Sequence, residues 1–342
     1  MTALQQETAH PNKSIRVSAP ARLHLGFFDL NGESGRKFGS IGLAIDSHRT
    51  TIEIEPAETL SINSVANIPT TITEKIERIV NKFYQSLGQE IPENKQGIKL
   101  SLLELIPEHA GLGSGTQLAI TIGTLLCRLH NISANTHEIA YNLGRGSRSG
   151  IGIATFDRGG FIIDGGLSDT SKIPPVLAHY DFPASWRIIV IMDQSNQGVH
   201  GSEEIKAFTQ LPTFPISQSQ AICHLTLMTL LPALVEKKVA PFGQAITEIQ
   251  TLIGDHFAPA QGGRYTSSSV AKLLQHAQNL GHTGIAQSSW GPTGCIFVDG
   301  DDTAHQLKES LIQYTQQENL PSLSLSIAHA NSNGADIEIN GK

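Results

Sequence analysis

The chain has 342 residues, of which 39% are hydrophobic and 16% charged, so it is long enough for about two folded domains. Its formal net charge is -7, which excludes an overall positive field that would attract nucleic acid or an anionic membrane. An anionic ligand would therefore need a local cluster of arginine side chains and backbone N–H groups.

The cysteines and the N-terminus favour a cytoplasmic protein. Cys127, Cys223 and Cys295 are far apart and form no CxxC pair, which argues against a disulfide framework or a zinc site and fits a reducing compartment. Residues 1–14 are polar, so we expect a disordered N-terminus rather than a signal peptide. No run approaches the ~18 apolar residues of a membrane span.

Short β-branched runs predict strands at residues 15–18, 51–55, 98–105, 161–164, 187–193 and 295–299. The run TIEIE (51–55) alternates apolar and polar residues, which indicates one solvated face. The run RIIVIMD (187–193) is continuously apolar before its final acid, which is typical of a buried strand.

Helices are predicted between these strands. Apolar residues in 116–130 follow one stripe of a 3.6-residue period. Asn135, three residues before Glu138, predicts an N-cap, and Gly144 predicts the end of that helix. A further helix is expected from the serines at 267–269 to Gly281. Because strands and helices do not alternate strictly, an α+β fold is favoured.

The proline-containing stretch 171–185 is the candidate domain boundary. We therefore expect domains at 15–182 and 183–342.

The stretch PEHAGLGSGTQLA (107–119) is typical of a phosphate-binding loop. Its glycines let the backbone approach a ligand, and the following helix presents unpaired N–H groups and the positive end of its dipole. A tight turn with a hydroxyl cap is the alternative interpretation. It is not a Walker A motif, because no Gly-Lys-Ser/Thr follows.

Three segments in order resemble the GHMP kinase superfamily: SAPARLHLGFFD (18–29), the glycine loop, and SSWGPTGCIFV (288–298). The resemblance implies a two-domain α+β fold, with a ribosomal S5 domain 2-like N-terminal domain and a ferredoxin-like C-terminal domain. The site would lie between the two domains.

One departure argues against a kinase. In many of these kinases a Ser-Gly-x-Asp segment supplies the carboxylate that activates the attacking hydroxyl, whereas this chain has Ser149-Gly150-Ile151-Gly152. Gly152 cannot accept a proton, so phosphoryl transfer to an alcohol would lose its usual base. A kinase with an unusual base and a non-catalytic binding module remain the alternatives.

Five segments resemble the β-ribofuranosylaminobenzene 5'-phosphate synthase family: residues 19–32, 106–119, 144–166, 258–270 and 287–294. That resemblance implies condensation of phosphoribosyl diphosphate with 4-aminobenzoate or 4-hydroxybenzoate, with release of CO2 and diphosphate, in tetrahydromethanopterin biosynthesis. Because CO2 leaves the ring carbon instead of a proton, no base would be needed there. Magnesium is the expected cofactor and no organic cofactor is expected; a homodimer is an expectation from the family.

The expected site follows from these segments. Catalytic roles are expected for Arg145, Arg148 and Ser149. The two arginines would pair bidentately with phosphate or carboxylate. The alternative is that they only satisfy the dipole at the end of a helix. Arg22 and His24 would share one strand face toward substrate anions, unless that face is solvated. Arg264 could grip the ribose 5-phosphate, and Trp290 could stack on the benzoate ring or anchor the core. The full set expected to bind substrate is Arg22, His24, Gly111, Leu112, Gly113, Ser114, Gly115, Thr116, Gln117, Ser147, His200, Arg264, Ser288, Ser289, Trp290, Gly291, Thr293 and Gly294.

Two acidic residues are candidates for other roles. Asp29 and Glu108 are the candidate metal or ribose ligands. Asp193, which ends the run RIIVIMD, lacks the second adjacent acid of the usual phosphoribosyl diphosphate motif. Recognition of that substrate is therefore expected from the glycine loop.

Overall fold

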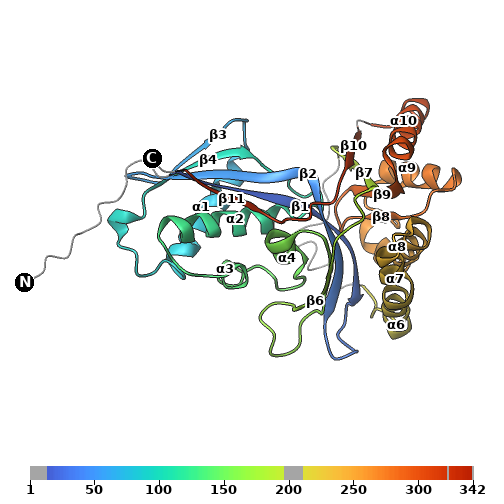
Figure 1. The fold of residues 1–342 in the computed structure, drawn as a ribbon, viewed down its shortest axis with the longest axis horizontal. Helices are drawn as coiled ribbons and strands as arrows, with labels where there is room; N and C mark the ends of the chain where they lie inside the picture. The colour runs from blue at the N-terminus through green and yellow to red at the C-terminus, as the bar shows by residue number, and fades with distance from the viewer. Residues whose placement is uncertain (1–13, 196–210, 322, 341–342) are drawn as a thin grey trace, which may run out of the picture.

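The computed structural model describes residues 14–195, 211–321 and 323–340. Their strands form two sheets that lie in separate halves of the molecule (Figure 1). The first sheet has seven strands, in the order β11-β1-β2-β4-β3, with β5 paired to β2 and β6 paired to β5. The second has four, in the order β10-β7-β9-β8.

The strands of the first sheet are β1 (Ser14–Asp29), β2 (Phe38–Pro56), β3 (Ser61–Ser64), β4 (Ile98–Glu104), β5 (Phe161–Asp164), β6 (Val176–Tyr180) and β11 (Asp336–Asn340). Those of the second are β7 (Trp186–Asp193), β8 (Ile285–Gln287), β9 (Thr293–Asp299) and β10 (Leu323–Ala328). Every strand expected from the sequence is present, and residues 51–55 alternate between buried and half-buried as predicted.

Helices cover one face of the first sheet (Figure 1) and both faces of the second. With the first sheet lie α1 (Thr70–Tyr84), the short 3₁₀ helix η1 (Glu93–Lys95), α2 (Ser114–Leu129), α3 (Thr136–Asn142) and α4 (Ile151–Arg158). With the second lie α6 (Ile216–Leu225), the π-helix η2 (Thr226–Leu230), α7 (Leu231–Val235), α8 (Val239–Gln261), α9 (Ser268–Asn279) and α10 (Asp301–Gln317).

The predicted helix starts are confirmed by their caps. Asn135 accepts a hydrogen bond from the Glu138 N–H while the Glu138 carboxylate accepts from the Asn135 N–H, forming a capping box. Ser267 accepts from the N–H of Val270 at the start of α9. These local hydrogen bonds satisfy N–H groups that a helix cannot pair internally.

The two largest buried clusters of the described residues form most of the core. One packs the first sheet against α1, α2 and α3, with Ile52 and Leu125 at its centre. The other runs from β1 and β2 to β7, β9 and α8, through Leu23, Val190 and Phe242. Because the second cluster is continuous between the halves, burial of apolar surface fixes how they meet.

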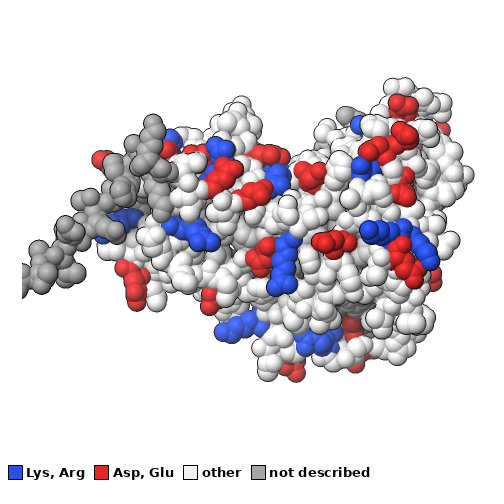
Figure 2. Space-filling view, in the orientation of Figure 1, with Lys and Arg blue, Asp and Glu red and all other residues white. Residues whose placement is uncertain are grey.

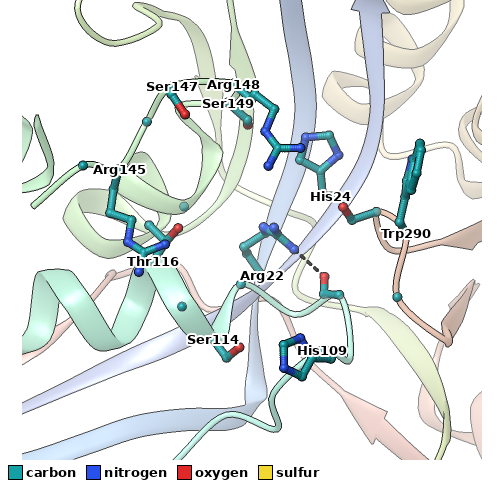
Figure 3. A pocket seen from close by; sticks show the side chains of 18 of the residues that line it. Arg22, His24, His109, Ser114, Thr116, Arg145, Ser147, Arg148, Ser149 and Trp290 are labelled. Atoms are coloured by element: carbon teal, nitrogen blue, oxygen red, sulfur yellow. Dashed lines mark hydrogen bonds between the residues drawn. The ribbon is translucent and has the colours of Figure 1, made fainter. Parts of the chain in front are cut away.

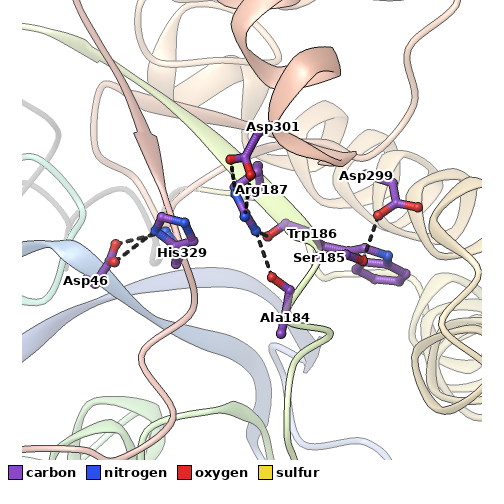
Figure 4. A network of polar contacts seen from close by, with 8 residues as sticks. All are labelled: Asp46, Ala184, Ser185, Trp186, Arg187, Asp299, Asp301 and His329. Carbon is purple, nitrogen blue, oxygen red and sulfur yellow. Dashed lines mark hydrogen bonds and ion pairs between the residues drawn. The ribbon is translucent and has the colours of Figure 1, made fainter.

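The last strand returns to the first sheet. β11 pairs antiparallel with β1, so it lies apart from the sheet that contains β10. On the way, His329 Nδ1 lies 3.1 Å from an Asp46 carboxylate oxygen, and nearby Arg187 pairs with Asp301 at 2.6 Å (Figure 4). The domain boundary between residues 182 and 183 stays a prediction. Residues 336–340, which belong to the second predicted domain, pair with β1 of the first sheet.

Residues Ile216–Val235 form one helical stretch of 20 residues. Its most apolar 18-residue segment has a mean hydropathy of 1.2, and 33% of that segment is buried. By length and composition alone it could cross a membrane, which is weak support for a span because core helices pass the same test.

Candidate functional site

A cavity of about 330 Å³ lies where β1, α1, α2, the loop 144–149 and the turn 289–291 meet (Figure 3). Segments from both halves of the fold line it, as expected from the sequence. Its predicted members are Arg22, His24, Gly111, Gly113, Ser114, Gly115, Thr116, Arg145, Ser147, Arg148, Ser149, Ser289, Trp290 and Gly291. Gly152 lines it as well.

The side chains around this cavity are strongly biased toward positive charge. Among the described residues that line it, none is Asp or Glu, whereas the basic and imidazole side chains are Arg22, His24, Lys75, His109, Arg145 and Arg148. The outer face in Figure 2 instead intersperses acidic and basic side chains. A chain of net charge -7 therefore contains a local site suited to an anion.

The glycine loop and the turn 288–291 meet backbone to backbone. A Cβ on Gly111, which has φ +81°, would lie 2.2 Å from the Ser288 carbonyl oxygen, so a side chain does not fit there. The Gly111 carbonyl accepts hydrogen bonds from Ser288 Oγ at 2.7 Å and from the Arg22 guanidinium. These contacts hold the loop to the second half of the fold.

The N-terminus of α2 opens into the cavity. The N–H groups of Ser114 and Gly115 donate to no atom of the described chain, as expected for the first turn of a helix. A Cβ on Gly115 would lie 3.6 Å from both Arg145 Nη1 and Lys75 Nζ. Two cations thus converge on the end of the helix where the dipole already favours an anion.

Arg145 is half-buried, with its Nε enclosed, and has no acidic partner among the described residues. Its Nε has no hydrogen-bond acceptor within the described residues, and none of their carboxylates forms an ion pair with it. Burial lowers the pKa of the guanidinium from its usual value. A partly buried cation of this kind is stabilised when an anion enters the cavity.

His24 is a neutral member of the site. Burial is the main cause that lowers its pKa well below the usual value, and the positive charges of Arg22 and Arg148 act in the same direction. Its ring lies 4.4 Å from that of Phe27, and no described group bonds its Nε2. The expected contact with substrate anions would have to come from a neutral imidazole donating a hydrogen bond.

The loop that carries Arg145 and Arg148 is held by Asp164, the buried last residue of β5. Its carboxylate accepts hydrogen bonds from Ser149 Oγ at 3.1 Å, the Gly150 N–H at 2.9 Å and the Gly166 N–H at 2.9 Å. The sequence showed Asp164 only as the end of a strand. Ser149 lines the cavity while its hydroxyl donates to this carboxylate.

Gly152 lies in the first turn of α4, against α2. A Cβ there would lie 2.9 Å from Thr116 Cγ2. The Gly152 carbonyl accepts from Gln117 Nε2 at 2.8 Å, so Gln117 braces the two helices and does not line the cavity. A side chain at position 152 would therefore require a shift of Thr116.

Several predicted residues lie outside this cavity. Arg264 makes a bidentate pair with Asp255 at 2.7 and 3.0 Å and lines two other pockets, one of which adjoins this cavity and shares His24 and Trp290 with it. The Asp29 carboxylate accepts from the N–H groups of residues 31, 32 and 34, which lowers its pKa against the opposing effect of burial. Leu112, Ser288, Thr293 and Gly294 are buried around the site, and His200 lies outside the described residues.

Sequence reasoning missed Phe27, Lys75 and His109, which line the cavity together with Gly144 and Gly146. His109 lies within the glycine loop at φ +58°, a conformation uncommon for a residue with a side chain. Lys75 comes from α1, a helix that was not among those predicted from the sequence.

The described residues do not fit a magnesium ion held by the protein. No group of three His, Cys, Asp or Glu side chains converges in the part of the chain that the structure describes. Asp29 is committed to backbone N–H groups, and Glu108 pairs with Lys75. Magnesium prefers carboxylate oxygens, which this cavity does not offer.

Comparison with known proteins identifies the family. The GHMP kinases N terminal domain matches residues 74–160, and the GHMP kinases C terminal domain matches residues 230–316. Beta-ribofuranosylphenol 5'-phosphate synthase from Methanocaldococcus jannaschii is 33% identical over 303 residues, covering 83% of this chain and 89% of that protein. The protein of that name from Archaeoglobus fulgidus is 30% identical over 337 residues, and the match covers 95% of this chain and 100% of that protein.

The chain belongs to the beta-ribofuranosylphenol 5'-phosphate synthase family. Its relatives carry the name of an enzyme that makes a riboside phosphate. The predicted family and the GHMP-kinase-like two-domain α+β fold are therefore confirmed.

Solved structures agree with this fold. Mevalonate diphosphate decarboxylase from Staphylococcus aureus is 14% identical with a TM-score of 0.66, covering 95% of this chain and 98% of that one. Homoserine kinase from Cytophaga hutchinsonii is 16% identical with a TM-score of 0.64, and the match covers 99% of this chain and 100% of that one. At these identities the likeness concerns the fold, which hosts more than one chemistry.

Proposed function

We propose that this chain transfers a 5-phosphoribosyl group from phosphoribosyl diphosphate to the carboxylate-bearing carbon of a 4-substituted benzoate. Carbon dioxide and diphosphate are released, and the product is a C-riboside 5'-phosphate of the kind that methanopterin-type cofactors contain. The observation that carries this proposal is the cavity with six basic or imidazole side chains and no acidic one among the described residues that line it. Such a site suits a polyanionic substrate and leaving group.

Departure of diphosphate breaks the bond between ribose C1 and oxygen, and the electron pair goes to the leaving oxygen. The N–H groups at the start of α2 and the Arg145 guanidinium are placed to stabilise that charge. Because these groups are held by the surrounding fold, little reorganisation is needed when the bond breaks.

The ring carbon then attacks C1 and forms the new carbon–carbon bond. The bond to the carboxylate breaks next, and its electron pair restores the aromatic ring as CO2 leaves. No proton leaves that carbon, so no base is required there. Gly152 is consistent with this scheme, because it has no side chain that could accept a proton, and a Cβ there would press against Thr116.

The identity of the ring substituent is open to direct comparison. A ribofuranosylphenol, the compound in the relatives' name, would follow from 4-hydroxybenzoate, whereas 4-aminobenzoate would give the aminobenzene. Both benzoates should be assayed with phosphoribosyl diphosphate, in the presence and in the absence of magnesium. Magnesium would then enter bound to the diphosphate rather than be held by carboxylates of the protein.

The test is to incubate the purified protein with carboxyl-labelled benzoate and phosphoribosyl diphosphate. Labelled CO2 and a riboside phosphate of the expected mass support the proposal. A folded protein that releases no CO2 with either benzoate contradicts it, and consumption of ATP with a small alcohol would favour a kinase instead.

A further inference from the structure

Lys75 is a second cation at the start of α2 that the sequence did not single out. It projects from α1 and lines the cavity, with Nζ 3.6 Å from the position of a Cβ on Gly115. Arg145 Nη1 lies at the same distance from that position. Lys75 and Arg145 therefore flank the free N–H groups of the helix from two different elements.

An ion pair holds Lys75 in this place. Its ammonium group donates to the carboxylate of Glu108, which immediately precedes His109 in the glycine loop. The two side chains are only 24% and 23% exposed, so the pair is more sheltered than the Lys99–Glu55 pair on β4 and β2, at 42% and 43%. Sheltered ion pairs hold a long side chain in one geometry better than exposed ones do.

The pair leaves the ammonium group capacity for another anion. An ammonium group has three N–H donors, and Glu108 is the one described acceptor of Lys75. A leaving diphosphate at the N-terminus of α2 would lie within reach of the remaining donors.

We infer that Lys75 binds the diphosphate leaving group together with Arg145, and that Glu108 positions Lys75 for this contact. This rests on the proposed function. When the bond between C1 and oxygen breaks, the electron pair stays on the diphosphate, and Lys75 keeps its protons and lowers the energy of the new charge. Glu108 acts through Lys75, which differs from the metal-ligand role expected from the sequence.

The experiment measures binding of inorganic diphosphate by calorimetry to the wild type, Lys75→Met, Lys75→Arg and the control Lys99→Met. Lys75→Met is expected to weaken binding by about 10- to 100-fold, because a charge-assisted hydrogen bond is lost. Lys75→Arg keeps the charge and should stay within about 10-fold of the wild type. Lys99→Met removes an equivalent ion pair away from the cavity and should bind diphosphate like the wild type. Equal affinities of Lys75→Met and wild type would overturn the inference.

Glu108→Gln distinguishes positioning from metal binding. If Glu108 positions Lys75, Glu108→Gln should weaken diphosphate binding by a smaller factor than Lys75→Met, to the same degree with and without magnesium. Diphosphate affinity equal to that of the wild type under both conditions would contradict the positioning role. A loss of affinity for diphosphate seen with magnesium only would assign Glu108 to the metal and overturn that role.

The two proposals fail in different ways. If the wild type binds diphosphate and Lys75→Met weakens it, but no benzoate releases CO2, the proposed reaction is wrong and the diphosphate site stands. If CO2 is released at the wild-type rate by a folded Lys75→Met, the reaction stands and the role of Lys75 is wrong.

Discussion

Thr116 and Gly152 touch across the first turns of α2 and α4: a Cβ at position 152 would lie 2.9 Å from Thr116 Cγ2 and 3.3 Å from Thr116 Cβ. The contact joins the helix that ends the glycine loop to the helix that follows the two arginines. Position 152 is also where the related kinases are expected to carry a carboxylate. Restoring that carboxylate should therefore disturb the site.

We predict that Gly152→Asp lowers stability by about 1–3 kcal/mol, because the added atoms displace Thr116 from a packed contact. CO2 release should fall as well, and no kinase activity should appear, since the shift moves the start of α2. Thermal unfolding and the labelled-carboxyl assay measure the two effects.

Gly152→Ala is the matched control, because it adds the clashing Cβ without a charge. It should reproduce most of the loss of stability. If Gly152→Asp gave a stable protein that phosphorylates an alcohol with ATP, the interpretation of this position would be wrong.

Replacing Arg145 by Met should separate activity from stability. The guanidinium is partly buried without a carboxylate partner in the described structure, so its removal should leave the free energy of unfolding unchanged or up to about 1 kcal/mol higher. Turnover should fall by roughly 10²–10³, because a group that stabilises the leaving charge is lost. Steady-state kinetics and chemical denaturation provide both values. A strongly destabilised variant would mean that Arg145 is a structural residue.

The pH dependence of stability should report on His24. Because its pKa in the folded protein lies well below the usual 6.5, the unfolded chain binds the proton first as the pH falls. Its contribution is therefore complete above about pH 6.5 and is lost as the pH falls below that value. His24→Gln should lose less stability than the wild type between about pH 7.5 and 5.5.

Other histidines do not obscure this comparison. Burial also lowers the pKa of His48, His130, His256 and His282, and these residues are present in both proteins. Denaturation of the two proteins across the pH series measures the difference. Parallel stability curves would show that His24 titrates normally.

Arg264→Ala tests the expected grip on the ribose 5-phosphate. Its bidentate bond to Asp255 lies outside the main cavity and is exposed, so we expect the KM for phosphoribosyl diphosphate to change by less than about 3-fold and stability by less than about 1 kcal/mol. The same KM is measured for the Asp255→Ala variant, in which Arg264 loses its carboxylate partner but keeps its charge. A KM that rises more than about 10-fold in Arg264→Ala alone would restore the phosphate-binding role.

The glycine loop, three of the helices and six of the strands could be predicted because they depend on local patterns. Gly111, Gly113 and the stripe of α2 are visible in consecutive residues, and the capping box at Asn135 and Glu138 is a four-residue signal. The alternation of Arg22 and His24 in β1 likewise placed both at the cavity.

What could not be predicted depends on partners distant in the sequence. Lys75 reaches the site through the packing of α1 beside α2, and Asp164 braces a loop some fifteen positions earlier in the chain. Asp255 takes Arg264 away from the main cavity, and burial makes His24 neutral. In each case the role is set by tertiary contact rather than by residue type.

The most direct test of the central claim is to measure CO2 and diphosphate together, in wild type and Arg145→Met, from phosphoribosyl diphosphate and each benzoate without ATP. We predict equal amounts of the two products at every time point and a parallel fall of both in the variant. Diphosphate released without CO2, or CO2 release that Arg145→Met leaves unchanged, would contradict it.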